Sequence, residues 1–194
     1  MNALTRLSPS ITKMIRADHT AVIATFHKYE VNASSGTKRA LVNTVCTALE
    51  IHAQLEEEIF YPEMRALDTR EVARSVPEHD EMRRLIGVLR AMDAAEAAFD
   101  ETFMNLMRDV LNHAAHEETV LLPDAERALS AERLSELGAQ MTRRRMELMA
   151  PRAGEIAVNA ARSHSGALIA GAGVLALGAF VAARAVKQQR TMRT

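Results

Sequence analysis

Two stretches of this chain carry histidine and glutamate at the same spacing, and both residue types bind metal ions. The pattern H-A-x-x-E-E-x-x-x-x-P begins at His52 and occurs again at His113, sixty-one residues later. Each copy is preceded by another histidine next to acidic residues, His19 in the first half and His79 in the second. The repeat therefore predicts two similar halves that contribute to one metal site.

These residues need helices to bring them together, and the composition favours helices. Aromatic residues make up only 4% of the 194 residues, and there is no Trp. Turn-forming residues and proline at first-turn positions separate the periodic stretches. Short connections then predict an all-α protein with an up-down-up-down four-helix bundle. We expect helices over about 9–31, 37–67, from about 75 onward and 101–129, with an extra C-terminal helix over 130–150 packed on the outside.

Helical phasing places the candidate ligands on inward faces. Spacings of three and four residues put His52 and Glu56 on the same stripe as apolar side chains. Burying an unpaired carboxylate costs several kcal/mol, and no Lys or Arg recurs at matching positions in the two halves. A pair of cations between the helices is the natural counter-charge, although a single histidine on such a face is more often an ordinary core residue. The candidate metal ligands are His19, His52, Glu56, His79, His113 and Glu117.

These stretches resemble the hemerythrin-like (HHE cation-binding) family. The resemblance rests on I-R-A-D-H ending at His19, on Phe26 and Tyr29, and on H-x-x-x-E from His52, followed by F-Y-P, and from His113. It covers roughly residues 8–150. The resemblance implies a four-helix bundle with two non-haem irons, oxo- or hydroxo-bridged, in which the histidines are terminal ligands and the two carboxylates bridge the irons.

The chain departs from the oxygen-carrying members of that family at two positions. They have a further histidine four residues after the counterpart of His79, where this chain has Arg83. They also place the last carboxylate five residues after its histidine, which Glu118 satisfies, whereas Glu117 shares the helix stripe and is preferred. The resulting near-symmetric centre favours binding, sensing or detoxifying dioxygen, peroxide or nitric oxide over reversible oxygen carriage.

Several neighbouring residues have two interpretations. His116 lies off the inward stripe, where a histidine is more often partly solvated, and the alternatives are a residue that supports a ligand or an alternate ligand. Tyr61 is either a hydrogen-bond donor to the site or a packing residue at a helix end. Glu57 and Glu58 are expected to form a solvated face.

Three residues have structural interpretations. Pro62 and Pro123 should each kink a helix or free a carbonyl one turn earlier. Cys46 is the only cysteine, which leaves no thiolate cluster for zinc or an iron–sulfur centre and favours a buried core role.

The end of the chain differs in charge from the rest. Residues 151–194 contain six Lys and Arg but one Glu, so an acidic body precedes a basic tail. An acidic body argues against nucleic acid as the main partner. Residues 165–183 are uncharged and long enough for a hydrophobic tail helix that crosses a bilayer. The alternatives are a buried or partner-bound helix and a tail lying on an anionic membrane. We expect a cytoplasmic protein, with membrane anchoring by the C-terminal helix as one arrangement.

Three classes of function fit these patterns. The first is a diiron protein that binds, senses or detoxifies small oxidants, or that handles iron. The second is a diiron oxidase or peroxide-decomposing enzyme. The third is a metal-free helical interaction module, which the doubled H-x-x-x-E pattern disfavours.

Overall fold

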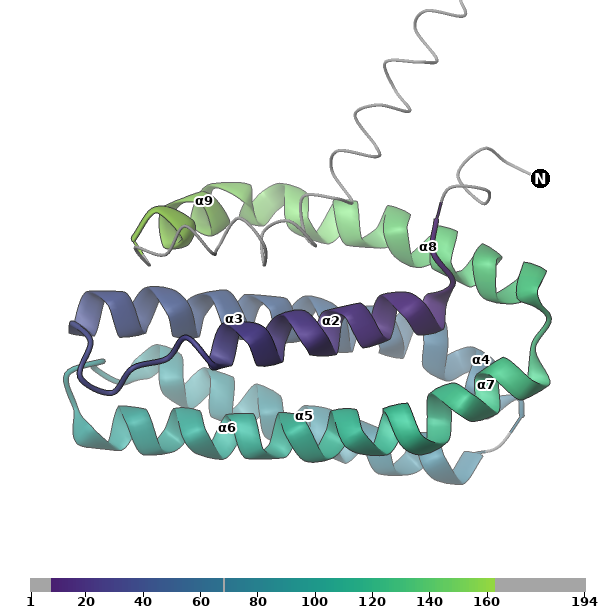
Figure 1. The fold of residues 1–194 in the computed structure, drawn as a ribbon, viewed down its shortest axis with the longest axis horizontal. Helices are drawn as coiled ribbons and strands as arrows, with labels where there is room; N and C mark the ends of the chain where they lie inside the picture. Colours follow the sequence, from purple (N-terminus) through teal and green to yellow (C-terminus); the bar gives the residue numbers. More distant parts are fainter. Residues whose placement is uncertain (1–7, 68, 163–194) are drawn as a thin grey trace, which may run out of the picture.

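The computed structural model describes residues 8–67 and 69–162, and every regular element within them is helical. The predicted all-α fold is therefore confirmed (Figure 1). The elements in chain order are α2 (Ile11–Phe26), α3 (Ser35–Leu55), a π-helix (Glu56–Phe60), α4 (Tyr61–Arg65), α5 (Thr69–Ala91), α6 (Ala97–His116), a second π-helix (Glu117–Leu121), α7 (Leu122–Ala128), α8 (Ala131–Met149), a 3₁₀ turn (Ala150–Arg152) and α9 (Ala153–Arg162).

Four long helices lie side by side, and each runs opposite to the one before it (Figure 1). Helix α2 packs against α3, and α5 packs against α6, so each half of the sequence repeat forms one helical hairpin. Contacts of α2 with α6 and of α3 with α5 join the two hairpins. Helices α8 and α9 form an outer layer, in which α8 packs on α2 and α3 and α9 packs on α3.

Helix ends follow the expected capping chemistry in part. The Ser34 hydroxyl accepts a hydrogen bond from the Thr37 amide and caps α3, and Ser130 caps α8 in the same way. The predicted start of the third helix near residue 75 was wrong, because α5 begins at Thr69 and has Pro77 in its interior. Pro77 is exposed, so water can solvate the carbonyl that its missing N–H leaves unpaired.

The buried apolar residues form two clusters. One contains Ile15, Leu55 and Phe60 together with the inward face of α8. The other contains Val22 and the rings of Phe99 and Phe103, among others. His19 lies between Ile15 and Val22 on α2, so the polar cluster lies between two apolar regions along the bundle. Such a position excludes water and strengthens electrostatic interactions.

Helix α8 confirms the predicted outer helix, with Leu134, Leu137, Met141 and Leu148 buried. Cys46 is fully buried, as predicted. No helix within residues 8–67 and 69–162 carries an apolar stretch of the length needed to cross a bilayer. The predicted tail helix over 165–183 lies outside the described residues and stays a prediction, as does the division of the chain into a bundle over 8–150 and a tail over 151–194.

Candidate metal centre

A π-helical turn begins at each candidate bridging carboxylate. Glu56 and Glu117 each start a five-residue π-helix, and each accepts an i→i+5 hydrogen bond from the backbone amide of Tyr61 or Leu122. The prolines predicted to disturb these helices follow directly, because a proline cannot donate the next helical hydrogen bond. Such turns occur frequently at functional sites.

The π turns also change which residues face inward. In an α-helix a residue five positions on lies off the stripe, whereas the wider turn returns it to the same face. Tyr61, five residues after Glu56, is therefore buried in the bundle, as is Leu122 after Glu117. The two halves are alike here in backbone but differ in side chain.

All six predicted ligand side chains are buried and converge between the four helices. The rings of His19 and His52, from the first half, have centroids 4.9 Å apart, and those of His79 and His113, from the second half, 4.7 Å apart. Two groups have donor atoms within 4.8 Å of one another: His19, His52, His113 and Glu117, and Glu56, His79 and His113.

The two carboxylates lie between the histidine pairs. Glu56 places Oε1 3.3 Å from His52 Nε2 and Oε2 3.3 Å from His79 Nε2, so it has one oxygen near each pair. Glu117 Oε2 lies 3.4 Å from His19 Nε2 and 3.6 Å from His113 Nε2. Both carboxylates thus reach a histidine from each half, Glu56 through its two oxygens and Glu117 through Oε2 alone.

An outer set of four carboxylates orients the four histidines. Each imidazole points Nε2 into the cluster and Nδ1 at an acidic side chain. Because a carboxylate only accepts, each Nδ1 carries the proton that it donates, so Nε2 is the nitrogen that would bind a metal once it has lost its own proton. The Nδ1–O distances are 2.9 Å for His19 with Glu118, 2.9 Å for His79 with Glu57, 2.9 Å for His113 with Glu78 and 3.5 Å for His52 with Asp18.

Arginines hold three of these carboxylates. Arg145, on α8, is buried and binds both oxygens of Asp18, at 2.8 and 2.5 Å. Arg83 pairs with Glu57, and Arg74 with Glu78, in both cases from more exposed positions. Among the four histidines, His52 therefore has the longest Nδ1 contact, and the ion pair that supports it is buried.

The charges and protonation of the cluster call for a cation. The Nε2 atoms of His79 and His113 lie 3.2 Å apart, and two lone pairs at that distance repel unless a positive ion lies between or beside them. Burial alone would lower the pKa of His113, but its bonds to Glu56 and Glu78 outweigh burial and raise the pKa to about 10. Burial would likewise raise the pKa of Glu56, yet the neighbouring histidines, His52 first, hold it well below its usual range. Without a metal, protons take the cationic role.

Tyr61 lies in the cluster, which is one of the two interpretations that the sequence left open. Its hydroxyl donates to Glu117 Oε1 at 2.8 Å and lies 3.3 Å from both Glu56 Oε2 and His79 Nε2. Burial raises the pKa of this phenol far above its usual value, and the two carboxylates add to the effect. The hydroxyl therefore stays protonated.

The alternates named from sequence lie outside the cluster. Glu117 is fully buried, whereas Glu118 is partly exposed and accepts a hydrogen bond from the outer nitrogen of His19, so Glu118 orients that imidazole from outside the cluster. His116 contacts Glu71 at 2.9 Å and Arg74 at 3.3 Å, away from the other histidines. Arg83 pairs with Glu57 and Asp80 at the rim.

The expectation that Glu57 belongs to a solvated face was wrong, because it accepts from His79 Nδ1. Glu58 is paired with Arg144 on the outside. Sequence reasoning also missed the roles of Asp18 and Glu78. The signal was present, since each precedes a repeated histidine by one residue, and Glu57 and Glu118 occupy matching positions in the two copies.

The fold and the buried histidine–carboxylate cluster define a helical metal-binding protein. The chain belongs to the Hemerythrin HHE cation binding domain family, which it matches over residues 10–125. The family resemblance read from the sequence is thus confirmed, and the cluster fits a site for a metal cation.

Two known proteins resemble this chain, one in fold and one in sequence. A crystal structure of a Hemerythrin HHE cation binding domain-containing protein from Mycobacterium kansasii has a TM-score of 0.66 and 20% sequence identity, covering 76% of this chain and 92% of that chain. This likeness shows a hemerythrin-like fold. A DNA nickase from Nostoc sp. is 28% identical over 127 residues, which are 63% of this chain. The chain spans only 35% of the length of that curated relative.

Proposed function

We propose that the cluster is a diiron centre that reacts with small oxidants, namely dioxygen, peroxide or nitric oxide. In this proposal His19 and His52 hold one iron, His79 and His113 hold the other, and Glu56 and Glu117 bridge them. The observation that carries it is that Glu56 has one oxygen near each histidine pair and Glu117 reaches a histidine of each half.

The donor atoms fit two cations. His19 Nε2, His52 Nε2, Glu56 Oε1 and Glu117 Oε2 are buried and lack hydrogen-bond partners among the described residues. Buried polar atoms of this kind cost free energy unless a ligand satisfies them. Around the four imidazoles, the inner and outer shells described above contain six carboxylates and three arginines, so two divalent ions compensate an excess of negative charge. Mixed imidazole and carboxylate donors without a thiolate favour iron over softer metals.

The supporting residues of this chain leave room for an exogenous ligand. Two imidazoles and oxygens of Glu56 and Glu117 would hold each iron, which is fewer donors than an octahedral ion takes and would leave coordination positions for an exogenous ligand. Arg83 occupies the position of the additional histidine found in oxygen carriers, and its guanidinium points to Glu57 at the rim. A redox-active iron pair supplies the electrons for oxidant chemistry, and the protein supplies a dry, fixed set of donors.

Metal analysis of the purified chain tests the proposal. We expect two irons per chain, together with absorption bands of an oxo-bridged diferric centre. His79→Ala should lose iron, because His79 contacts Glu56 in the cluster, whereas His116→Ala, a histidine bonded only outside it, should retain both irons. A wild-type chain that binds no iron under reducing reconstitution would refute the proposal in favour of a metal-free helical module.

The Arg83→His variant tests the inference that the irons have open coordination positions. The substituted imidazole would fill one position on the second iron and move the protein towards a stable oxygen adduct. The measurement is the lifetime of the oxygenated spectrum after the reduced protein is mixed with dioxygen. If neither oxygen nor peroxide behaviour changes in an iron-loaded variant, the argument from coordination number fails.

Tyr61 favours a second candidate function, an enzyme that decomposes peroxide or activates oxygen. Cleavage of an O–O bond needs a proton on the departing oxygen, and the Tyr61 hydroxyl is a hydrogen-bond donor inside the cluster, 2.8 Å from Glu117 Oε1. The second half has Leu122 at the matching position, which cannot supply a proton. Tyr61→Phe should slow peroxide turnover by on the order of 100-fold if Tyr61 is a general acid. Unchanged turnover in the iron-loaded variant would leave binding or sensing as the function.

A further inference from the structure

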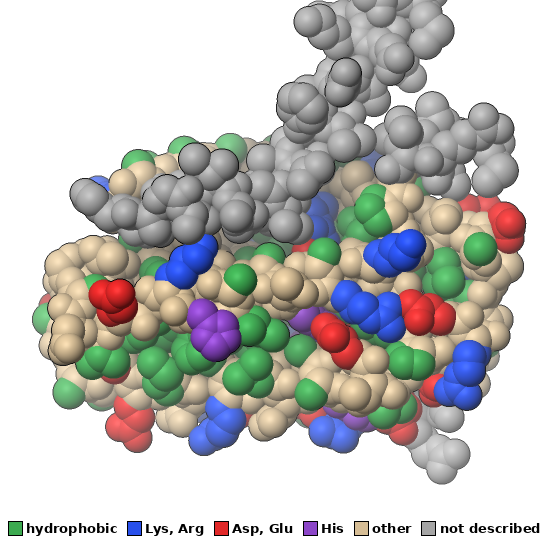
Figure 2. Space-filling model, viewed as in Figure 1, with side chains coloured by type: hydrophobic (Ala, Val, Ile, Leu, Met, Phe, Trp, Pro, Cys, Tyr) green, Lys and Arg blue, Asp and Glu red, His purple; other side chains and the backbone are tan. Residues whose placement is uncertain are grey.

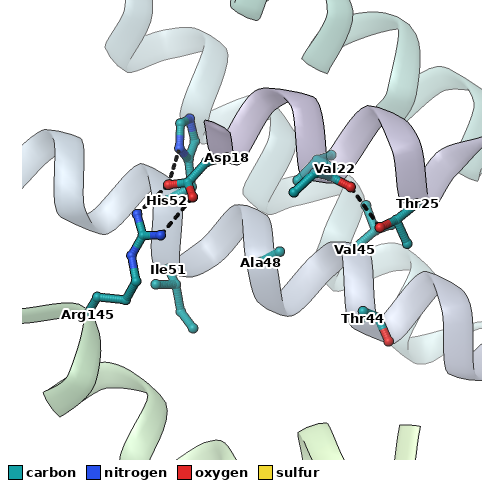
Figure 3. Close-up of a pocket in the computed structure, with 10 residues that line it drawn as sticks. Asp18, Val22, Thr25, Thr44, Val45, Ala48, Ile51, His52 and Arg145 are labelled. Atoms are coloured by element: carbon teal, nitrogen blue, oxygen red, sulfur yellow. Dashed lines mark hydrogen bonds and ion pairs between the residues drawn. The ribbon is translucent and has the colours of Figure 1, made fainter. Parts of the chain in front are cut away.

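A small, largely apolar cavity lies beside the cluster. It lies between α2 and α3, has a volume of about 40 Å³, and ends at His52 (Figure 3). Its wall is formed by the buried side chains of Val22, Val45 and Ile51. His52 forms part of the lining, and its Nε2 lies 3.3 Å from Glu56, so one imidazole separates the cavity from the centre of the cluster.

Small side chains keep this cavity open. Ala21, Thr44 and Ala48 line it and are only partly buried, which places them towards its mouth. Figure 3 shows Thr44 and Ala48 on α3 along the space that leads towards His52. A longer side chain at any of these positions would occupy the space that now leads inward.

The second half of the repeat has polar residues at three of the matching positions. The counterparts of Ala21, Ala48 and Ile51 are Glu81, Asp109 and Asn112. These polar residues line a wide, open groove between α5 and α6. The pseudo-twofold symmetry of the ligands is therefore broken by their surroundings, apolar on the His52 side and charged on the His113 side.

The polar end of the cavity is closed by an internal ion pair. Arg145 lines the cavity from α8 and binds Asp18, which in turn contacts His52 (Figure 3). Arg145 Nε is buried and has no hydrogen-bond partner among the described residues. Ligands that carry charge would have to compete with this pair, whereas uncharged ones need not.

We propose that this cavity binds an uncharged diatomic molecule, dioxygen or nitric oxide, and delivers it to the iron held by His52. A water-sized molecule needs about 10–15 Å³ of such space, and cavities with largely apolar walls take up apolar guests such as xenon. The volume admits a diatomic molecule and excludes larger substrates. The proposal rests on the proposed function, which it sharpens by naming the class of substrate and the route.

Xenon tests the cavity independently of any metal. In the amide NMR spectrum of the metal-free full chain, xenon pressure should shift the signals of Val45 and Ala48 saturably. Ala48→Phe should abolish these shifts. Ala24→Phe is the matched control, because Ala24 is an exposed residue of α2 that does not line the cavity. Absence of a saturable shift in the wild type, or its persistence in Ala48→Phe, overturns the proposal.

Stopped-flow kinetics test delivery in the reduced, iron-loaded chain. Ala48→Phe should slow the reactions with dioxygen and nitric oxide about tenfold or more, equivalent to a barrier raised by about 1.4 kcal/mol. Ala24→Phe should react at the wild-type rate. Thr44→Leu narrows the same mouth and replaces Ala48→Phe if that variant folds poorly. Whichever gas is slowed is the guest, and wild-type rates for both gases refute the proposal.

The peroxide reaction rate and the iron content distinguish a failure of the cavity proposal from a failure of the diiron proposal. Peroxide is polar and should react with Ala48→Phe at the wild-type rate; equal slowing of all three reactants would indicate damage to the centre and count against the cavity. A chain that binds xenon but no iron would refute the diiron function while leaving the binding cavity in place. A chain that binds iron but no xenon would refute the binding cavity while leaving the diiron function in place.

Discussion

Removing Arg145 should destabilise the protein far more than removing a comparable arginine on the same helix. Arg145 and Asp18 form a two-point ion pair in which the side chains are only 7% and 12% exposed. Arg145→Met leaves a nearly buried carboxylate with His52 as its remaining partner. Breaking one side of a buried pair costs about 3–5 kcal/mol, because the abandoned charge keeps its desolvation penalty. For a chain of this size that cost lowers the melting temperature by roughly 6–20 °C.

Arg133 provides the matched control. It also lies on α8 and binds both oxygens of its partner, Glu63, but the two side chains are 40% and 23% exposed. Arg133→Met should therefore cost about 0.2–1 kcal/mol. Both variants remove an arginine that binds both oxygens of one carboxylate, and Arg133 has an additional exposed contact with Glu136 at 3.3 Å, so a smaller loss for Arg133→Met would reflect its lower burial.

A double-mutant cycle in urea measures the coupling directly. Asp18→Asn combined with Arg145→Met removes both charges and keeps an acceptor for His52, so the double variant should be more stable than the sum of the two single losses predicts, by about 2 kcal/mol or more. The metal-free protein is used, since bound metal would add its own stabilisation. Equal losses for Arg145→Met and Arg133→Met, or coupling below about 0.5 kcal/mol, would refute the reasoning from burial.

Three further predictions concern other parts of the chain. An added Cβ at Gly138 would overlap the backbone oxygen of Pro9, so a Gly138→Ala variant should lose stability in thermal unfolding, whereas Gly87→Ala, which meets nothing, should gain about 0.5–1 kcal/mol. Burial raises the pKa of the Cys46 thiol to about 12 from 9.0. The neutral thiol therefore contributes its full stabilisation below pH 9, and this contribution is lost as pH rises towards 12. At pH 10 the free energy of unfolding should have fallen by about 1.4 kcal/mol, and Cys46→Ala should remove this fall from the pH dependence of urea unfolding. Glu118→Gln, which weakens support for one histidine, should lower iron affinity about 10–100-fold in competition with a chelator, and Glu58→Gln should not.

The surface agrees with a protein whose chemistry is internal. On the face seen in Figure 2, acidic and basic side chains of the described residues are interspersed rather than gathered into one stripe. Many of them pair with each other, as Arg16 does with Glu126. Such pairs contribute little to stability individually. The buried histidine–carboxylate cluster is therefore the feature of the described residues that most needs a functional explanation.

The inward position of six side chains was predictable from sequence because helical periodicity is local. Spacings of three and four residues place His52 and Glu56 on one face whatever the rest of the chain does. The repeat then extends the same reasoning to His113 and Glu117. Helix boundaries were less predictable, as Pro77 shows, because an exposed proline can be accommodated inside a helix that tertiary contacts hold together.

Tertiary structure alone decided how these side chains are held and approached. Asp18 and Arg145 are 127 residues apart, and nothing local to either residue indicates that α8 would bring them together beside His52. The inward turn of Tyr61 depends on the π-helix, which shifts the helical phase by one residue. The cavity beside His52 depends on the gap between α2 and α3, which arises from the packing of several small side chains. Periodicity in the sequence predicted which six side chains face inward, whereas the residues that hold them and the cavity beside them arise from contacts between segments far apart in the chain.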